Sequence, residues 1–208
     1  MTAPQSLFLA SGNPHKVREL QELSDQAGLR LRFHSAKEIG GMPDVVEDTG
    51  TFEGNARKKA HALRALVPPH AWVLADDSGI CVDALEGGPG VESAYFAGPE
   101  NDDDANLTKL IEVMRSVPTA QRGAHYVCVL YLIAKHGGEH VFEGKCHGQL
   151  AVKPTGKGGF GYDPLFVPDG FTDTFGVLPA TTKQELSHRG AAWQKLARWM
   201  ANKLDEET

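Results

Sequence analysis

The chain changes from a strand pattern to a helix pattern within its first 28 residues, and this change limits the folds open to it. The apolar run Ser6–Ala10 has the length of a buried strand and stops at the turn-forming residues 11–14. Apolar residues then recur at helical spacing over 14–27, with Asn13 as the expected N-cap and Gly28 as the stop. A strand that turns directly into an amphipathic helix is typical of α/β proteins.

The same alternation continues along the rest of the chain. The patterns predict helices over Thr51–Leu66 and Asp103–Met114 and from Ser187 onward, and strands over Trp72–Ala75, Ala124–Ala134 and His140–His147. The last two strands are expected to form a hairpin, because they are separated by His136-Gly137-Gly138-Glu139. Strands and helices that alternate early, followed by a hairpin, predict an α/β fold with a mixed sheet.

Composition and charge exclude several classes of protein. With 208 residues, of which 41% are apolar and 23 are glycine, the chain has a globular composition and the length of a single domain. It carries 21 basic and 27 acidic side chains, for a net charge of −6. A chain this acidic is not expected to bind nucleic acid through bulk attraction to phosphates. An anionic ligand would need a local cluster of cations.

Location follows from three absences in the sequence. No apolar run approaches the ~20 residues of a membrane helix, and no signal peptide is readable at the N-terminus. Cys81, Cys128 and Cys146 lie far apart without a CxxC spacing, which favours reduced thiols. We therefore expect a cytoplasmic protein that does not bind membranes.

Two motif matches fail on their structural context. His136 to His140 reads as HxxEH, but a zinc site of this kind needs both histidines on one helix, and a hairpin turn is expected here. Gly156 to Gly161 reads as GxGxxG, but Tyr162-Asp163-Pro164 follows where a dinucleotide-binding fold needs a helix. This glycine-rich loop could still bind a nucleotide in another manner.

Residues 11–16 form a candidate anion site. Ser11, Gly12, Asn13, Pro14, His15 and Lys16 combine free amides at a helix start with a hydroxyl, an amide side chain and a lysine. The alternative is an ordinary capped turn between a strand and a helix. The segment is not a Walker A loop, since GxxxxGK[ST] does not occur in the chain.

Two acidic pairs suggest a metal. Glu47-Asp48 precedes Thr49-Gly50, and Asp76-Asp77 ends a strand and precedes Ser78-Gly79. Adjacent carboxylates repel each other, and Mg²⁺ would offset that repulsion while bridging phosphate oxygens. A strand directs Asp76 and Asp77 to opposite faces. Each pair taken alone is equally compatible with a solvated turn.

The C-terminal half of the chain supplies cations and an aromatic face. Phe160 and Tyr162 lie among glycines and are suited to stacking on a nucleobase. The alternatives are a core position for Phe160 and solvated surface positions for the lysines. The basic candidates are Lys153, Lys157, Lys183, His188 and Arg189. Together with the acidic pairs, they favour a Mg²⁺-dependent enzyme acting on a nucleoside polyphosphate.

Six segments, read in order, resemble the inosine/xanthosine triphosphate pyrophosphatases. They are SGNPHKVREL at 11–20, EDTGTFEGNARKKA at 47–60, LADDSG at 74–79, GGPGVES at 87–93, GKGGFGYDPLF at 156–166 and LSHRG at 186–190. The resemblance implies a Mg²⁺-dependent enzyme that hydrolyses noncanonical purine nucleoside triphosphates (ITP, dITP, XTP) to the monophosphate and pyrophosphate. A purine-nucleotide-binding regulator without catalysis is the alternative, but it would have no use for Asp77.

The resemblance also implies a fold and a set of site residues. The fold would be an elongated, two-lobed α/β domain over residues 1–208, with a curved mixed sheet, a central substrate cleft and a homodimeric state. Asp77 would be the base, Glu47 and Asp77 would hold Mg²⁺, and residues 11–16 would bind the phosphates. The other substrate contacts would be Lys59, Ser78, Phe160, Gly161, Tyr162, Asp163, Lys183, His188 and Arg189.

The chain departs from the family pattern at three places. Tyr95 stands where an arginine is common, Val177 where an acid is common, and Asp48 where a second glutamate is common. The first departure puts any contact of that arginine in doubt, and the third could shift the metal geometry.

Overall fold

The computed structural model describes residues 4–206. Its helices are α1 (Pro14–Gln26), α2 (Phe52–Arg64), α3 (Asp103–Val113), α4 (Ala180–Leu186) and α5 (His188–Glu206). Its strands are β1 (Gln5–Ala10), β2 (Leu31–Ser35), β3 (Trp72–Val82), β4 (Gly123–Ile133), β5 (Glu139–Leu150) and β6 (Phe166–Pro168). No helix in this described range is long and apolar enough to cross a membrane.

The strands form one sheet in the order β2-β1-β3-β4-β5-β6. β1 pairs in parallel with both β2 and β3, whereas β5 and β6 are antiparallel. The sheet is therefore mixed, and the predicted α/β class is confirmed. The predicted hairpin is also confirmed, because the amide of Ala134 donates to the carbonyl of Gly138 across the turn (2.7 Å).

Three helices or strands were not predicted, and two strands, β3 and β5, are longer than predicted. β2, β6 and α4 have five, three and seven residues, too few for a clear periodicity in the sequence. β3 continues through Asp76 and Asp77 to Val82 instead of ending at the acidic pair. Both carboxylates are buried, so charge alone was a poor signal for the end of this strand. The GxGxxG segment leads into β6 and not into a helix, so it lacks the helix that a dinucleotide-binding fold needs, as expected from the sequence.

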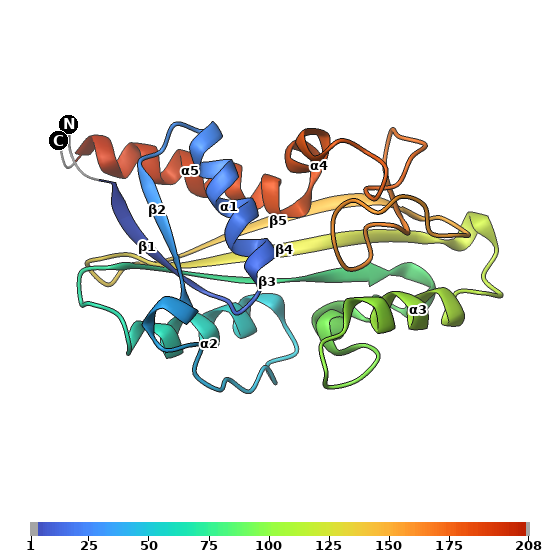
Figure 1. Cartoon of the computed structure of the whole chain (residues 1–208), viewed down its shortest axis with the longest axis horizontal. Helices are drawn as coiled ribbons and strands as arrows, with labels where there is room; N and C mark the ends of the chain where they lie inside the picture. The colour runs from blue at the N-terminus through green and yellow to red at the C-terminus, as the bar shows by residue number, and fades with distance from the viewer. Residues whose placement is uncertain (1–3, 207–208) are drawn as a thin grey trace. The chain divides into compact units, whose positions relative to one another are not determined.

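The chain divides into two compact units, and β3, β4 and β5 contribute residues to both. Unit 1 contains Met1–Asp77, Cys128–Gly144 and Arg189–Thr208. Unit 2 contains Ser78–Val127 and Lys145–His188. Within unit 1, α1 and α5 lie on one side of β1 and β2, and α2 lies on the other side (Figure 1).

Each unit has its own hydrophobic core. In unit 1, Leu20 and Leu23 of α1 and Trp193 and Leu196 of α5 pack on β1 to β5 residues such as Leu9. In unit 2, the core brings α3 together with apolar residues of the strands and of the loop before β6. These include Ile80, Leu110, Met114, Tyr126, Tyr162 and Phe166. Burial of these side chains fixes the strand ends from which the polar residues described below project.

One arginine, Arg122, links two segments of unit 2, the turn after α3 and the end of β5, through hydrogen bonds. The Arg122 side chain is buried, and its guanidinium donates to the carbonyls of Leu150 (3.0 Å), Met114 (2.7 Å), Val117 (3.3 Å) and Ala151 (2.8 Å). The side chain thereby joins the end of β5 to the turn after α3.

We expect Arg122→Met to lower the free energy of unfolding by about 3 kcal/mol or more, because it leaves several buried carbonyls unpaired. Urea denaturation checks this. Arg115→Met removes an exposed arginine from the same segment and should change stability by less than about 0.5 kcal/mol. Equal effects of the two substitutions would contradict the structural role of Arg122.

Candidate functional site

The segment from Ser11 to Lys16 forms a capped entry to α1. The side chain of Asn13 accepts from the amide of His15 (2.8 Å), and Pro14 occupies the first turn of the helix. The hydroxyl of Ser11 accepts from the amide of Asn13 (3.1 Å). Gly12, Pro14 and His15 are exposed, so the loop presents its backbone at the surface of unit 1.

Lys16 is held by Asp76 of β3. Its ammonium group is hydrogen-bonded to the Asp76 carboxylate and donates to the carbonyl of the same residue (3.4 Å). The Asp76 side chain is fully buried, whereas Lys16 keeps 15% of its side chain exposed. Lys16, the lysine of the predicted anion loop, is thus held by a buried carboxylate and is still partly exposed at the surface.

Asp76 has a second cationic partner, Arg189 at the start of α5. The Nε atom of Arg189 donates to Asp76 (2.7 Å), and its Nη1 donates to Glu19 of α1 (2.5 Å). The Arg189 side chain is 1% exposed. The structure therefore places Arg189 in a buried ion-pair network of unit 1, and its predicted contact with a base stays a prediction.

Asp77 lies on the other side of β3, as predicted. Lys59 of α2 donates to Asp77 Oδ1 (2.5 Å) and to Glu47 Oε2 (3.0 Å), so one ammonium group joins both predicted metal ligands. The second carboxylate oxygen of Asp77, Oδ2, is buried and makes no hydrogen bond. Buried carboxylate oxygens are ordinarily paired, so this one is a candidate for a proton, a water or a cation.

The two neighbouring aspartates differ in acidity. Burial raises the pKa of Asp77 to about 6, against the opposing effects of Lys59 and Lys16. Burial also acts to raise the pKa of Asp76, but Arg189 and Lys16 outweigh it and hold that pKa well below its ordinary value. Lys59 stays charged, because Asp77 and Glu47 outweigh its burial and raise its pKa. Acidic groups whose pKa values are driven apart are typical of acid–base sites.

The other acidic pair is also divided by the structure. Glu47 accepts from Lys59, whereas the neighbouring Asp48 is bonded to Lys58. The Asp48 side chain is 61% exposed. An exposed pair of this kind contributes little to stability, and Asp48 does not join Glu47 at the Lys59 ammonium.

A second cluster of predicted residues lies in unit 2. Asp163 Oδ2 accepts from the ammonium of Lys183 (2.7 Å) and from the amide of Phe160 (2.8 Å). The Lys183 ammonium lies 4.6 Å from the centroid of the Phe160 ring. Phe160 is half-buried, so it is not a core residue, while Asp163 and Lys183 are buried beside it.

The remaining unit 2 candidates occupy different environments. The ring of His188 stacks on that of Tyr126 (4.6 Å between centroids, 9° between planes). Tyr162 is buried in the core and donates its hydroxyl proton to the carbonyl of Ser93 (2.7 Å). An aromatic face shared by Phe160 and Tyr162 is therefore not observed, and a substrate contact of Tyr162 stays a prediction.

Ser78-Gly79 passes very close to a neighbouring turn. A Cβ atom on Gly79 would lie 2.3 Å from the carbonyl oxygen of Gly90 and 2.4 Å from Oγ of Ser93. This contact requires glycine, and it lets Ser93 Oγ accept from the amide of Ile80 (2.9 Å). Ser78 is half-buried where unit 2 begins.

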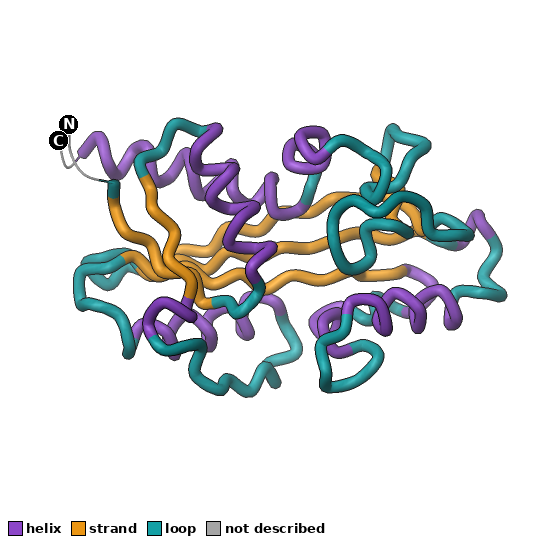
Figure 2. The backbone as a smooth tube through the Cα atoms, in the orientation of Figure 1, coloured by secondary structure: helices purple, strands orange, loops and turns teal. Residues whose placement is uncertain are grey.

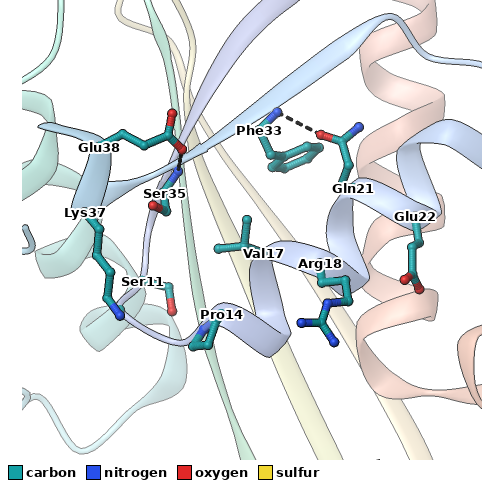
Figure 3. Close-up of a pocket in the computed structure, with 11 residues that line it drawn as sticks. Ser11, Pro14, Val17, Arg18, Gln21, Glu22, Phe33, Ser35, Lys37 and Glu38 are labelled. Atoms are coloured by element: carbon teal, nitrogen blue, oxygen red, sulfur yellow. Dashed lines mark hydrogen bonds between the residues drawn. The ribbon is translucent and has the colours of Figure 1, made fainter.

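A cavity of about 410 Å³ lies beside the N-terminal end of α1 (Figure 3). Ser11, Gly12 and Pro14 line it together with Phe33 and Lys37. The volume is in the range of small-molecule pockets. Its lining does not include Lys59, Glu47 or Asp77, so the cavity borders the anion loop but not the residues with perturbed pKa values.

Sequence reasoning missed the residues that hold the site in place. Glu19, Asn55 and Tyr126 were not candidates, and Asp76 was considered only as half of an acidic pair that could bind Mg²⁺. Glu19 could have been found, since it is an acid three residues after Lys16 on the same helix. The contact of Asp76 with Arg189 joins residues 113 positions apart and leaves no local signal.

Among the described residues, no group of three or more His, Cys, Asp or Glu lies close enough to hold a metal by itself. Lys59 joins the carboxylates of Glu47 and Asp77, and the binding of a cation by this pair stays a prediction.

A mixed α/β protein with a buried carboxylate–lysine site is the class that fold and geometry define. The sequence model of the Ham1 family matches residues 7–199. The chain is 54% identical over 197 residues to the dITP/XTP pyrophosphatase of Opitutus terrae, covering 93% of this chain and 97% of that protein. It is 42% identical to the dITP/XTP pyrophosphatase of Leuconostoc mesenteroides, over 92% and 94% of the two chains.

A solved structure agrees with these matches. The Ham1 protein of Staphylococcus aureus superposes with a TM-score of 0.81 at 32% identity, covering 96% of this chain and 100% of that one. The chain belongs to the Ham1 family, and the resemblance identified from the sequence is confirmed.

We expect Asp76→Asn to destabilise the protein by about 3–5 kcal/mol, because it leaves Lys16 and the buried Arg189 without their shared carboxylate. The lowered pKa of Asp76 gives stability that is present above the unfolded pKa of about 3.9 and is lost as the pH falls below it. The free energy of unfolding should therefore fall less steeply on acidification in the variant than in the wild type.

Urea denaturation between pH 3 and 7 measures both effects. Asp25→Asn serves as the control, because Asp25 is an exposed carboxylate of α1 with a single side-chain partner, Gln21. A loss of stability no larger than that of the control would show that the Asp76 network is not needed for folding.

Proposed function

We propose that this chain hydrolyses noncanonical purine nucleoside triphosphates, ITP, dITP and XTP, to the monophosphate and pyrophosphate, which removes them from the nucleotide pool. The relatives named above carry the activity dITP/XTP pyrophosphatase. The observation that carries the proposal is the unpaired Oδ2 of Asp77, a buried carboxylate oxygen beside a lysine. A protein that only bound nucleotides would have no use for such a group.

Mg²⁺ is the cofactor that the donor set fits. Magnesium is commonly bound by one or two carboxylates together with substrate phosphates, and Glu47 and Asp77 are such a pair. The buried, unpaired Oδ2 of Asp77 is a free acceptor for it. Bound there, Mg²⁺ would polarise the phosphate oxygens and lower the pKa of a coordinated water.

The residues of unit 1 have separate tasks in the reaction. The Asp77 carboxylate accepts the proton of the attacking water, and Lys59 keeps this carboxylate oriented through Oδ1. The loop of residues 11–16, with the Lys16 ammonium and the amide of Gly12, binds the phosphates and offsets the charge of the leaving pyrophosphate. Asp76 and Arg189 touch no reacting atom in this scheme and position Lys16.

The residues of unit 2 bind the base and sugar. The backbone amide of Phe160 donates to Asp163, and the half-buried Phe160 ring is suited to stacking on the base. The Lys183 ammonium lies next to this ring and adds a hydrogen-bond donor. His188 and Gly161 complete this group. In the sequence, His188 of this group directly precedes Arg189 of the unit 1 cluster, and Ser78, a further predicted substrate contact, directly follows Asp77. We infer that the chain acts as a single pyrophosphatase domain.

We also propose that the protein is cytoplasmic and forms a homodimer. Cys81, Cys128 and Cys146 are free thiols, which supports a reducing compartment such as the cytoplasm. Association as a homodimer is proposed on the family resemblance alone.

Pyrophosphate release tests the function. With ITP and Mg²⁺ we expect equal amounts of IMP and pyrophosphate and no inorganic phosphate. ATP should react far more slowly, because its 6-amino group would oppose donors that pair with a 6-oxo group, and each mismatch costs about 1–3 kcal/mol. Comparable kcat/KM values for ATP and ITP would refute the base preference. Full activity in excess chelator would refute the metal.

Substitution of Asp77 tests the assigned base. Asp77→Asn keeps the size of the side chain but removes the charge and the proton acceptor, so kcat for ITP should fall by about 10³-fold or more. Nucleotide affinity should stay within about tenfold, because residues 11–16 and Phe160 are unchanged. Asp48→Asn, which removes the exposed neighbouring carboxylate of the other pair, should change kcat less than about threefold. A folded Asp77→Asn variant with near wild-type turnover would refute the role of Asp77.

A further inference from the structure

Glu47 lies on a segment that has no regular structure of its own. Residues 41–51 contain neither helix nor strand and lead directly into α2 (Figure 2). A carboxylate that must face Asp77 cannot be placed by such a segment without contacts that fix its backbone. Contacts with another element must therefore hold this loop.

Side chains of α2 supply these contacts. Lys58 donates to the carbonyl of Val46 (3.1 Å) and is bonded to Asp48, but both charged side chains are largely exposed and such pairs contribute little. Asn55, one turn before Lys59, is 1% exposed. Its Oδ1 accepts from the hydroxyl of Thr49 (2.7 Å) and from the amide of Thr49 (3.3 Å).

The contact between α2 and this loop also depends on a glycine. A Cβ atom on Gly54 would lie 2.4 Å from Oγ1 of Thr49 and 2.9 Å from Oγ1 of Thr51, so no larger residue fits. Thr51 in turn caps α2 by accepting from the amide of Gly54 (3.1 Å). Thr49 is thereby seated on the first turn of the helix, two residues after Glu47.

Asn55 lowers stability in a way that an apolar residue at the same position would not. Its Nδ2 is buried without a hydrogen-bond partner, and an unpaired buried donor costs about 1–3 kcal/mol. An apolar side chain of similar size would carry no such penalty. What the amide supplies in return is its oxygen, which holds the loop at Thr49.

We propose that Asn55 is the positioning residue that sets Glu47 for the divalent cation. Asn55 and Lys59, four residues apart, share one face of α2. Asn55 fixes the backbone of the loop, and Lys59 holds the Glu47 carboxylate (3.0 Å). Asn55 itself touches neither cation nor substrate. This inference rests on the proposed function, because it presumes a cation at Glu47 and Asp77.

The chain offers a matched control in unit 2. Asn106 is also the fourth residue of its helix and is also 1% exposed. Its Oδ1 accepts from the backbone amide of Ala97 (2.6 Å), and its Nδ2 donates to the carbonyl of Ala94 (2.9 Å). It therefore holds a loop to a helix in the same manner, but no predicted metal ligand lies on that loop.

The experiment compares Asn55→Leu with Asn106→Leu. Residues that orient metal ligands change metal affinity by about 10- to 100-fold, so Asn55→Leu should raise the half-saturating Mg²⁺ concentration by about tenfold or more. At saturating Mg²⁺, kcat for ITP should stay within about threefold. Calorimetric titration of the nucleotide-free protein with Mn²⁺ should show the same loss of affinity. Asn106→Leu should lower the melting temperature and leave both metal measurements unchanged.

Thr49 gives an independent arm, because its exposed side chain can be changed without opening the core. Thr49→Val removes the hydroxyl that bonds to Asn55 and should weaken Mg²⁺ binding in the same direction, whereas Thr49→Ser should restore it. Hydrogen exchange of the amides at 47–50 should be faster in Asn55→Leu and Thr49→Val than in the wild type.

The outcomes separate the two proposals. A metal affinity within twofold of wild type in a folded Asn55→Leu variant would overturn the positioning role, as would an equal shift in Asn106→Leu. If Asn55→Leu does not fold, an unchanged Mg²⁺ requirement in Thr49→Val overturns it. A wild-type protein that binds neither Mg²⁺ nor Mn²⁺ would instead refute the metal site of the proposed function.

Discussion

The structure of the site depends on two adjacent carboxylates that face opposite sides of one buried strand. Alternation along β3 sends Asp76 toward α1 and α5 and Asp77 toward α2. Two cations satisfy Asp76, which keeps it ionised and makes it a structural charge. Asp77 has one lysine and an unpaired oxygen, so it remains open to chemistry. Asp76 thus stabilises the fold, whereas its neighbour Asp77 keeps a buried carboxylate oxygen without a hydrogen bond, which costs stability.

The lysines extend this division of tasks. Lys16 and Lys59 come from the first turn of α1 and the second turn of α2, and each is fixed by one of the two aspartates. Their ammonium groups therefore take their spacing from the strand and not from the flexible lysine side chains. An oriented cation needs little reorganisation when a phosphate arrives, which is the advantage of a preorganised site.

The local parts of this arrangement could be predicted from the sequence. The helix starts, the N-cap Asn13 and the hairpin after Ile133 follow from capping and turn chemistry within a few residues. The grouping of Glu47, Lys59 and Asp77 followed from family resemblance, and the structure brings the three within hydrogen-bonding distance. The location of Arg189 could not be predicted, because its partners Asp76 and Glu19 are brought to it only by the packing of α1 and α5 on the sheet. The proposed role of Asn55 could not be predicted for a similar reason. A buried asparagine in a helix can have many roles, and the contact of Asn55 with Thr49 is not visible in the sequence.

The charged residues of unit 1 do not by themselves attract a polyphosphate. Lys16, Lys59 and Arg189 face four carboxylates, those of Glu19, Glu47, Asp76 and Asp77, so this network of described residues carries a net charge of −1 when all are ionised. A polyphosphate brought to such a cluster would meet no net attraction, in a chain whose total charge is also negative. A divalent cation at Glu47 and Asp77 would reverse the sign of the cluster and leave the lysines free to bind phosphate oxygens. The carboxylates that make the cluster negative are also the ones that fix its cations. This is the electrostatic reason for proposing that the positive charge that attracts a polyphosphate comes with a metal ion.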